Sequence, residues 1–382
     1  MKKYVKLVCI ICISIVFLKC ESDIEVEPSS PIFNLTNESV LYENNEFNNC
    51  NPKAIYSEVN KEIYIVFTCV PPTLDSTAIM FTVLSEESGE VIQPAIQIGS
   101  TISLSSFPNI ALSTDRIFVT WHGQNNSLEG LAIVELSRDG TIQRSFISET
   151  ESPVSSKGDA LLTSQTSLFH FFNIEQDEDM SSMVCIQASF TDGIEIENSI
   201  NFGNGLIHNA YWDNGLIKVV YTQNGNLTTA TFDQQSGSFE NILNLETIEH
   251  FDPVVSLSPL KYGGVVAAIA QISKDLSLQF YSSDGNPTKT VNLSSEAYNF
   301  SNIAVNDSLI SIAWVTSENN LEFTLYNFVS SQLYKPKQMN NSTTGLAIEP
   351  LLLYVPSGIF TFWRDTRNNN GGDIYYRRTD KL

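Results

Sequence analysis

The hydrophobic positions of this chain form one phrase that recurs along its length, a short apolar strand ending on a large side chain. The phrase occurs seven times, and successive copies are spaced by 45 to 54 residues. The strands end on Phe67, Trp121, Phe172, Tyr221, Ile269, Trp314 and Trp363. A period of this length is typical of repeat folds in which each unit is one small antiparallel sheet. The pattern therefore predicts seven copies of one structural unit.

Each copy is flanked by the same elements, as the second unit illustrates. A short apolar strand at 110–112 precedes the strand at 117–121, and a third strand follows at 131–134. The turn Asp139-Gly140 then leads into a fourth strand at 142–147. Asp-Gly favours a tight hairpin because glycine adopts positive φ at little cost. Each unit is thus expected to be a four-stranded antiparallel meander.

The second strand of each unit is apolar on both faces. In the first unit, residues 63–67 are all apolar, so hydrophobic side chains point to both sides of the strand. A strand with one face in water would alternate polar and apolar residues, so this strand belongs between stacked sheets. Tandem β-sandwiches, the alternative, would need linkers and irregular connections. We expect an all-β chain in which residues 32–382 form a seven-bladed β-propeller of four-stranded antiparallel blades.

The last unit is one strand short, because its third strand spans 374–378 and the sequence ends at Leu382. Two apolar stretches near the N-terminus, at 32–35 and 40–42, belong to no unit. An N-terminal strand that pairs with the last blade would close the ring and remove two free sheet edges. We expect one of these stretches to complete blade seven.

The last unit also carries a resemblance. It reads FWRDTR at 362–367 and DIYYRR at 373–378, which resembles the repeats of sialidase-like bacterial β-propellers. The resemblance implies the fold, because propellers host many unrelated functions. Sialidase chemistry is not expected, since no arginine precedes Arg116 and the early arginine motif of those enzymes is absent. The turns at 137–141 and 282–285 occupy the place of an Asp-box without its spacing or its tryptophan.

The N-terminus has the layout of an export signal. Lysines precede an apolar stretch from Leu7 to Leu18, which is too short to span a bilayer. The stretch leads to Cys20 with no small-x-small cleavage site, which resembles a bacterial lipoprotein signal whose cysteine carries the lipid. Acidic residues after Cys20 resemble the export tag of Bacteroidetes surface lipoproteins.

We therefore expect residues 1–19 to be a lipoprotein signal peptide, Cys20 to be the lipid attachment site and residues 20–31 to be a flexible acidic tether. The protein would then be an outer membrane lipoprotein of the bacterial cell envelope, exposed at the surface. An uncleaved signal anchor and ordinary secretion are the alternatives.

The charge of the chain limits its partners. The chain has 43 acidic and 21 basic side chains and a net charge of −22. It would repel phosphate backbones, so nucleic acid is not expected as a partner. We expect a monomer that binds a protein or carbohydrate ligand and contacts the membrane through its lipid.

Three cysteines follow Cys20, at positions 50, 69 and 185, and their spacing fits no zinc motif. A hairpin that turns at Asn60-Lys61 would bring Cys50 close to Cys69, and an exported protein can be oxidised. We expect a disulfide between Cys50 and Cys69, with Cys185 a buried thiol.

Ligands of propellers most often bind on the face formed by the loops that follow each second strand and enter each first strand. In this chain those loops carry aromatic, amide and charged side chains, whereas the opposite face has short turns. The candidate ligand-binding residues are His122, Phe251, Tyr298, Arg364, Asp365 and Arg367. In the structural alternative, the rings close the ends of blades and Asp365 pairs with a nearby arginine.

The acidic run at 175–179 is a weak candidate for a metal site. Glu175, Asp177 and Asp179 could converge on Ca²⁺, which takes oxygen ligands, although a solvated acidic loop is favoured. No histidine pair accompanies the run. No other cofactor and no catalytic residue is predicted.

Two functions remain open at this stage. The favoured one is a cell-envelope binding or scaffold propeller without catalysis, for a protein or glycan ligand. The alternative is a propeller-type glycoside hydrolase or lyase, which requires carboxylates at the mouth of the channel. In a hydrolase two carboxylates would lie roughly 5–10 Å apart.

Overall fold

The computed structural model describes residues 33–42, 48–71, 77–101, 107–125, 128–147, 160–177, 180–247, 254–260, 263–270, 275–294, 297–341, 344–368 and 372–380. The expected signal peptide at 1–19 and tether at 20–31, with Cys20, lie outside these residues. The described residues form 29 strands. No helix among them is long and apolar enough to cross a membrane.

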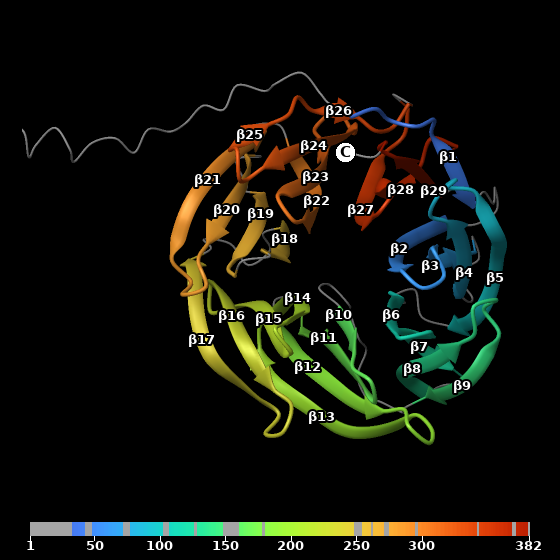
Figure 1. Cartoon of the computed structure of the whole chain (residues 1–382). Coiled ribbons are helices and arrows are strands. Elements are labelled where there is room, and N and C mark those ends of the chain that lie inside the picture. The colour runs from blue at the N-terminus through green and yellow to red at the C-terminus, as the bar shows by residue number, and fades with distance from the viewer. Residues whose placement is uncertain are drawn as a thin grey trace, which may run out of the picture.

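The strands form seven antiparallel sheets arranged in a ring (Figure 1). The chain is a seven-bladed β-propeller of four-stranded antiparallel blades, as the repeat predicted. In blades 1 to 6 the strands follow sequence order from the innermost strand outward, and in blade 7 the outermost strand is β1.

Blade 1 consists of β2 (Asn48–Ser57), β3 (Glu62–Val70), β4 (Thr77–Ser85) and β5 (Val91–Thr101). Blade 2 consists of β6 (Asn109–Ser113), β7 (Arg116–Asn125), β8 (Leu128–Leu136) and β9 (Ile142–Ile147). Blade 3 consists of β10 (Ala160–Thr163), β11 (Ser167–Asp177), β12 (Met180–Ser189) and β13 (Glu195–Asn204). Blade 4 consists of β14 (Leu206–Asp213), β15 (Leu216–Gln223), β16 (Asn226–Asp233) and β17 (Ser238–Thr247).

Blade 5 consists of β18 (Val254–Pro259), β19 (Val265–Ala270), β20 (Leu276–Tyr281) and β21 (Pro287–Ser294). Blade 6 consists of β22 (Ala297–Asn306), β23 (Leu309–Thr316), β24 (Leu321–Asn327) and two short strands, β25 (Gln332–Leu333) and β26 (Lys337–Gln338), which both pair with β24. Blade 7 consists of β27 (Ala347–Val355), β28 (Gly358–Asp365), β29 (Asp373–Arg378) and β1 (Ser39–Tyr42).

The second strand of each blade is the hydrophobic centre of the fold. All nine residues of β3 are buried. Ile65 and Phe67 pack in one cluster with Phe362 of blade 7, and Val66 packs in another cluster with Val119 of blade 2. A strand that is apolar on both faces therefore joins its blade to the two neighbouring blades, which is the reason for the pattern in the sequence.

Residues from the N-terminal part of the chain close the ring. β1 pairs with β29, so the stretch at 40–42 supplies the missing strand. The other stretch also contributes, since Leu35 forms a bridge with Thr379. Phe33 is buried against blade 6, where its ring meets that of Phe323 edge-on with centroids 5.5 Å apart.

The innermost strands turn toward the centre of the ring an edge that no further strand of their own blade covers. Polar side chains at one repeated position bridge these edges between neighbouring blades. The three bonds run from Asn209 to the Leu257 carbonyl (2.9 Å), from the Ile303 N–H to Ser256 (3.1 Å) and from the Leu352 N–H to Asn302 (3.0 Å). The three polar residues occupy the same position in their blades. Each lies opposite the residue that precedes the large side chain ending the apolar phrase of the second strand: Val220, Ala268 and Ala313. These bonds link blades 4 to 7 in series.

The predicted disulfide between Cys50 and Cys69 is not formed, and both cysteines, like Cys185, are free and buried. A β-bulge after Cys50 shifts the register, so Cys50 lies opposite Thr68 and Cys69 lies opposite Asn49. Directly opposed residues share a face of the sheet and sequence neighbours alternate between faces. The two thiols therefore point to opposite sides of the blade.

Candidate ligand-binding site

One side of the ring carries most of the candidate residues. Because neighbouring strands in every blade are antiparallel, all first strands begin and all second strands end on the same side. We call this side the mouth rim and the other side the opposite rim. Arg364, Asp365 and Arg367 follow Trp363 at the end of β28, so they lie at the mouth rim of blade 7.

Asp365 and Arg367 form a buried structural pair. The Asp365 carboxylate accepts hydrogen bonds from the Arg367 guanidinium, from the Arg367 backbone N–H at 3.0 Å and from the Trp363 indole at 3.3 Å. Arg367 also donates to Glu38 in the N-terminal segment, and its guanidinium lies 4.2 Å from the centre of the Tyr375 ring. Asp365 therefore pairs with a nearby arginine, as the structural alternative proposed. The pair holds the loop after β28 and the N-terminal segment in place, so we no longer count Asp365 and Arg367 among the ligand-binding candidates.

Arg364 meets a different carboxylate. Its Nη1 lies 3.4 Å from Oε1 of Glu349 in the innermost strand β27. The other oxygen of Glu349, Oε2, accepts a hydrogen bond of 2.8 Å from the backbone N–H of Asn51 in blade 1. The side chains of Arg364 and Glu349 are 19% and 24% exposed. Glu349 therefore joins blade 7 to blade 1 while part of the ion pair stays open to solvent.

The backbone at this junction is unusual. Glu349 has a φ of 55° and Asn51 a φ of 54°, and each is the residue before a proline in a β-bulge of an innermost strand. A positive φ is uncommon for a residue other than glycine or asparagine. Such strained positions gather at functional sites, so we place the centre of the candidate site at Glu349 and Arg364.

Neighbouring residues shape the surroundings of this pair. Leu346, just before β27, is apolar and yet 41% exposed. Gly372 packs so closely on Arg364 that a Cβ would lie 2.8 Å from the Arg364 Nε. Burial, and after it the charge of Glu349, raises the pKa of the Cys50 thiol to about 12. The thiol is therefore protonated at neutral pH and is not a nucleophile.

The carboxylates near Arg364 and Arg367 can be compared with those that a glycoside hydrolase requires. Three carboxylates bond to Arg364 and Arg367: Glu349 is 24% exposed, whereas Glu38 and Asp365 are 7% and 1% exposed. The two-carboxylate mechanism of most glycoside hydrolase families needs two accessible carboxylates, one of them as acid. Within this described corner of the mouth rim, a single accessible carboxylate can accept hydrogen bonds but cannot take both roles.

His122 is a core residue, which corrects its place among the ligand candidates. Its side chain is 3% exposed, and its ring lies 5.3 Å from that of His170 and 4.5 Å from that of Phe172, centre to centre. Burial lowers the pKa of His122 to about 3, and burial followed by the proximity of His122 lowers the pKa of His170 well below its ordinary value. The sequence placed His122 in a loop because the apolar phrase ends at Trp121, whereas β7 continues to Asn125.

The remaining candidates lie outside what the structure describes. These are Phe251, Asp179 and the side chains of Tyr298, Glu175 and Asp177. Among the described residues no three His, Cys, Asp or Glu side chains gather as metal ligands. The calcium site thus remains a prediction from the sequence.

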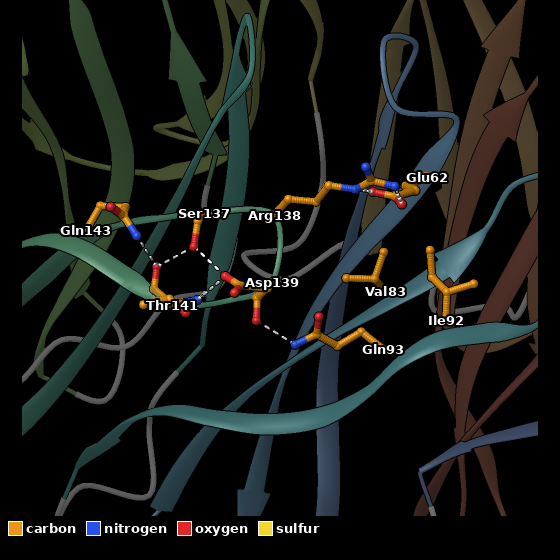
Figure 2. A pocket seen from close by; sticks show the side chains of 9 residues that line it. All are labelled: Glu62, Val83, Ile92, Gln93, Ser137, Arg138, Asp139, Thr141 and Gln143. Carbon is orange, nitrogen blue, oxygen red and sulfur yellow. Dashed lines mark hydrogen bonds and ion pairs between the residues drawn. The ribbon is translucent and has the colours of Figure 1, made fainter.

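A groove lies on the opposite rim between blades 1 and 2 (Figure 2). Arg138, in the turn after β8, reaches across it to the buried carboxylate of Glu62 at the start of β3. Asp139 in the same turn accepts hydrogen bonds from the Ser137 hydroxyl at 2.5 Å and the Thr141 N–H at 3.1 Å. These groups serve the turn and the contact between blades. The sequence indicated no groove here, because the hollow forms only where the turn of one blade packs on the next blade.

Sequence reasoning passed over Glu349, which interrupts no motif and lies in an otherwise apolar strand. The available signal was the dipeptide Glu349-Pro350 before the core of a first strand, which Asn51-Pro52 repeats in blade 1. The contact between these two dipeptides appears only once the last blade lies beside the first.

Comparison with known proteins bears on the fold. No family model matches the sequence, and no curated protein matches it. A solved ulvan lyase of polysaccharide lyase family PL25, bound to -[GlcA(1-4)Rha3S]-, has a TM-score of 0.57 at 11% identity over 86% of this chain and 93% of that one. The polysaccharide lyase Uly1 has a TM-score of 0.53 at 9% identity over 95% and 94% of the two chains.

A prolyl endopeptidase is similar over part of its length. Its TM-score is 0.52 at 11% identity, and the match covers 85% of this chain and 48% of that one. The chain therefore spans about half the length of that enzyme. At these identities the three likenesses show the propeller fold, which hydrolases and lyases share, and nothing finer.

Proposed function

We propose that this chain is a binding propeller of the bacterial cell envelope, without catalytic activity, which holds a protein or glycan ligand at the mouth rim where blades 7 and 1 meet. The observation that carries the proposal is the partly exposed ion pair of Glu349 and Arg364, built on a left-handed backbone. A single carboxylate bonded to an arginine suits recognition by hydrogen bonds.

The net charge of the chain limits the charge of the ligands that it can bind. The net charge is −22, and the two arginines described at this corner are each bonded to carboxylates. A polyanion would meet long-range repulsion, and both of these arginines are already bonded to carboxylates. A neutral or basic ligand therefore fits the site best.

Matched variants on the two rims test the location of the site. Leu346→Asp changes an exposed side chain three residues before Glu349 at the mouth rim, and Gln143→Asp changes an exposed side chain at the groove of Figure 2. We expect Leu346→Asp to weaken binding at least tenfold, because it adds a charge and removes apolar contact. Affinity electrophoresis against a panel of polysaccharides and glycoproteins measures this. Loss of binding in Gln143→Asp alone would move the site to the opposite rim.

We also propose that the protein is held at the outer membrane by a lipid on Cys20, with residues 20–31 as the tether. The signal layout supports this, and two or three acyl chains bind a membrane firmly where one chain does not. In Cys20→Ala the lipid cannot attach, so the protein is expected to leave the membrane fraction on cell fractionation. Protease accessibility on intact cells reports surface exposure. Unchanged membrane association of Cys20→Ala would contradict the anchor.

The outer edges of the blades support a monomer. A free edge strand invites pairing with another chain unless bulges or proline interrupt it. β5, the outermost strand of blade 1, contains Pro94, and its pairing with β4 shifts register three times. We propose that such edges keep the propeller from associating through its rim.

A polysaccharide lyase is the second candidate function. The observation in its favour is that the two polysaccharide lyase structures match this chain over nearly the full length of both partners. A lyase needs a base and a group that neutralises the carboxylate of the uronate substrate. Arg364 would be the neutralising group at this site, but its charge is already paired with that of Glu349. Incubation with uronate polysaccharides, followed by the ultraviolet absorbance of the unsaturated product, decides between the two functions.

A further inference from the structure

The junction of blades 7 and 1 differs from the junctions before it. Between blades 4 and 7, neutral asparagine or serine side chains bridge the edges of the innermost strands. At the corresponding position blade 7 has Leu351, opposite Phe362, and the bridge to blade 1 comes from Glu349 instead. An asparagine-like acceptor would satisfy the N–H of Asn51 without bringing a charge. The junctions from blade 4 to blade 7 thus show that neighbouring blades can be bridged without an ion pair.

The strain at Glu349 points the same way. Its φ of 55° lies in the left-handed region, which is unfavourable for a residue with a Cβ. Asparagine, which occupies the equivalent place at Asn51, tolerates this conformation better. A glutamate at this position is therefore less favourable for the backbone than an asparagine would be, and its side chain is 24% exposed.

The pair presents an acceptor beside a donor. A carboxylate accepts about four hydrogen bonds and a guanidinium donates five. Glu349 directs Oε1 to Arg364 and Oε2 to Asn51, which leaves acceptor capacity on both oxygens. The pair thus offers a donor and an acceptor whose atoms, Arg364 Nη1 and Glu349 Oε1, lie 3.4 Å apart.

From these contacts we infer that the ligand is an uncharged glycan, gripped through two adjacent hydroxyls by Glu349 and Arg364; the inference rests on the proposed binding function. One hydroxyl donates to the carboxylate and its neighbour accepts from the guanidinium. Leu346, three residues before Glu349 in the chain, is 41% exposed and would offer an apolar surface to the C–H face of the sugar ring. Since the ion pair is neutral as a whole and the chain is strongly acidic, uronate or sulfated polymers are disfavoured.

Chemical removal of the adjacent hydroxyls tests the inference on the ligand. The probes are dextran and a galactomannan, each native and after periodate oxidation, which cleaves vicinal diols, with alginate as the acidic polymer. We expect the full chain to bind at least one native neutral polymer, with little dependence on salt. We expect oxidation to reduce that binding at least tenfold, and alginate not to bind.

Variants of the protein supply the matching test. Glu349→Gln keeps an acceptor for Asn51 but loses the charge, and it should weaken binding to the native neutral polymer about tenfold with little change in melting temperature. Glu195→Gln, on the exposed face of the outer strand β13, removes the same charge far from the site and should bind normally. If Glu349→Gln unfolds, Leu346→Ala replaces it, because that side chain is exposed.

Different results would contradict the glycan inference and the proposed binding function. Equal binding of native and oxidised polymers, tighter binding of alginate, or binding of glycoproteins alone with sensitivity to Leu346→Asp overturns the glycan inference and leaves the mouth-rim site in place. Loss of binding in Gln143→Asp with normal binding in Glu349→Gln and Leu346→Asp overturns both.

Discussion

The protein is expected to lose about 4 kcal/mol of unfolding free energy between pH 7.5 and pH 5 through His122 and His170 alone. Both imidazoles are fully buried and stacked between blades 2 and 3. Burial lowers the pKa of His122 to about 3 and that of His170 well below its ordinary value. The folded protein therefore keeps both rings neutral over this range of pH.

The unfolded chain behaves differently, because its histidines take up protons below about pH 6.5. Where the unfolded state binds more protons, stability rises with pH. The contribution of each histidine is thus complete above pH 6.5 and is lost as the pH falls toward the folded pKa. At pH 5, about 1.5 pH units below the unfolded value, the loss is about 2 kcal/mol for each ring.

Urea unfolding at several pH values measures this loss. His122→Phe keeps an aromatic ring against Phe172 and removes one titrating group. The part of the pH dependence that comes from the two histidines should therefore be about half as steep in this variant as in the parent. Phe172→Leu disturbs the same cluster without removing a titrating group, and its curve should run parallel to that of the parent. A parent curve that is flat between pH 7.5 and 5, or a His122→Phe curve with the parent slope, would show that the rings are not buried neutral.

The second large effect is expected at Arg367, whose replacement by alanine should destabilise the protein by about 3 kcal/mol. Burial alone would lower the pKa of the Arg367 guanidinium, but its bonds to Asp365 and Glu38 raise the pKa above its ordinary value. Without the arginine, the carboxylates of Asp365 and Glu38, which are 1% and 7% exposed, lose their cation. The cost comes from these two desolvated charges.

Arg144→Ala is the matched control. Arg144 is 40% exposed and shares Glu135 with Arg116, which still holds that carboxylate when Arg144 is removed. Its replacement should change stability by about 0.5 kcal/mol or less. Chemical denaturation compares the two variants, and limited proteolysis shows whether residues 33–42 come loose in Arg367→Ala. Equal losses in both variants would mean that the ring closure does not depend on Arg367.

The sequence was informative wherever the cause of a structure is local. Strands that are apolar on both faces, and turns that contain glycine, recur because every blade meets the same two neighbours. Their spacing therefore predicted the number of blades and the second strand of each blade. The short last unit and the two apolar stretches at 32–35 and 40–42 also predicted that an N-terminal strand closes the ring, and the structure selects the second stretch.

The sequence predicted the ligand-binding residues less accurately, because the position of a residue after an apolar phrase does not show where its side chain points. His122 extends a strand and is buried, Asp365 pairs with Arg367, and Arg364 is the one of the three blade 7 candidates that stays beside an accessible carboxylate. The expected disulfide failed because one bulge shifts the register, and a shift of one residue reverses the face on which a cysteine lies.

The sequence by itself thus determined the repeat and the number of blades, since both follow from side-chain periodicity within about fifty residues. It also predicted that an N-terminal strand closes the ring, but which of the two apolar stretches pairs with β29 was decided by the tertiary structure. The site was decided by the tertiary structure. Glu349 bonds to Asn51 across 298 positions, and Arg367 bonds to Glu38 across 329. Such pairs form because a closed ring brings its last blade against its first, and no local pattern along the chain encodes which side chains then meet.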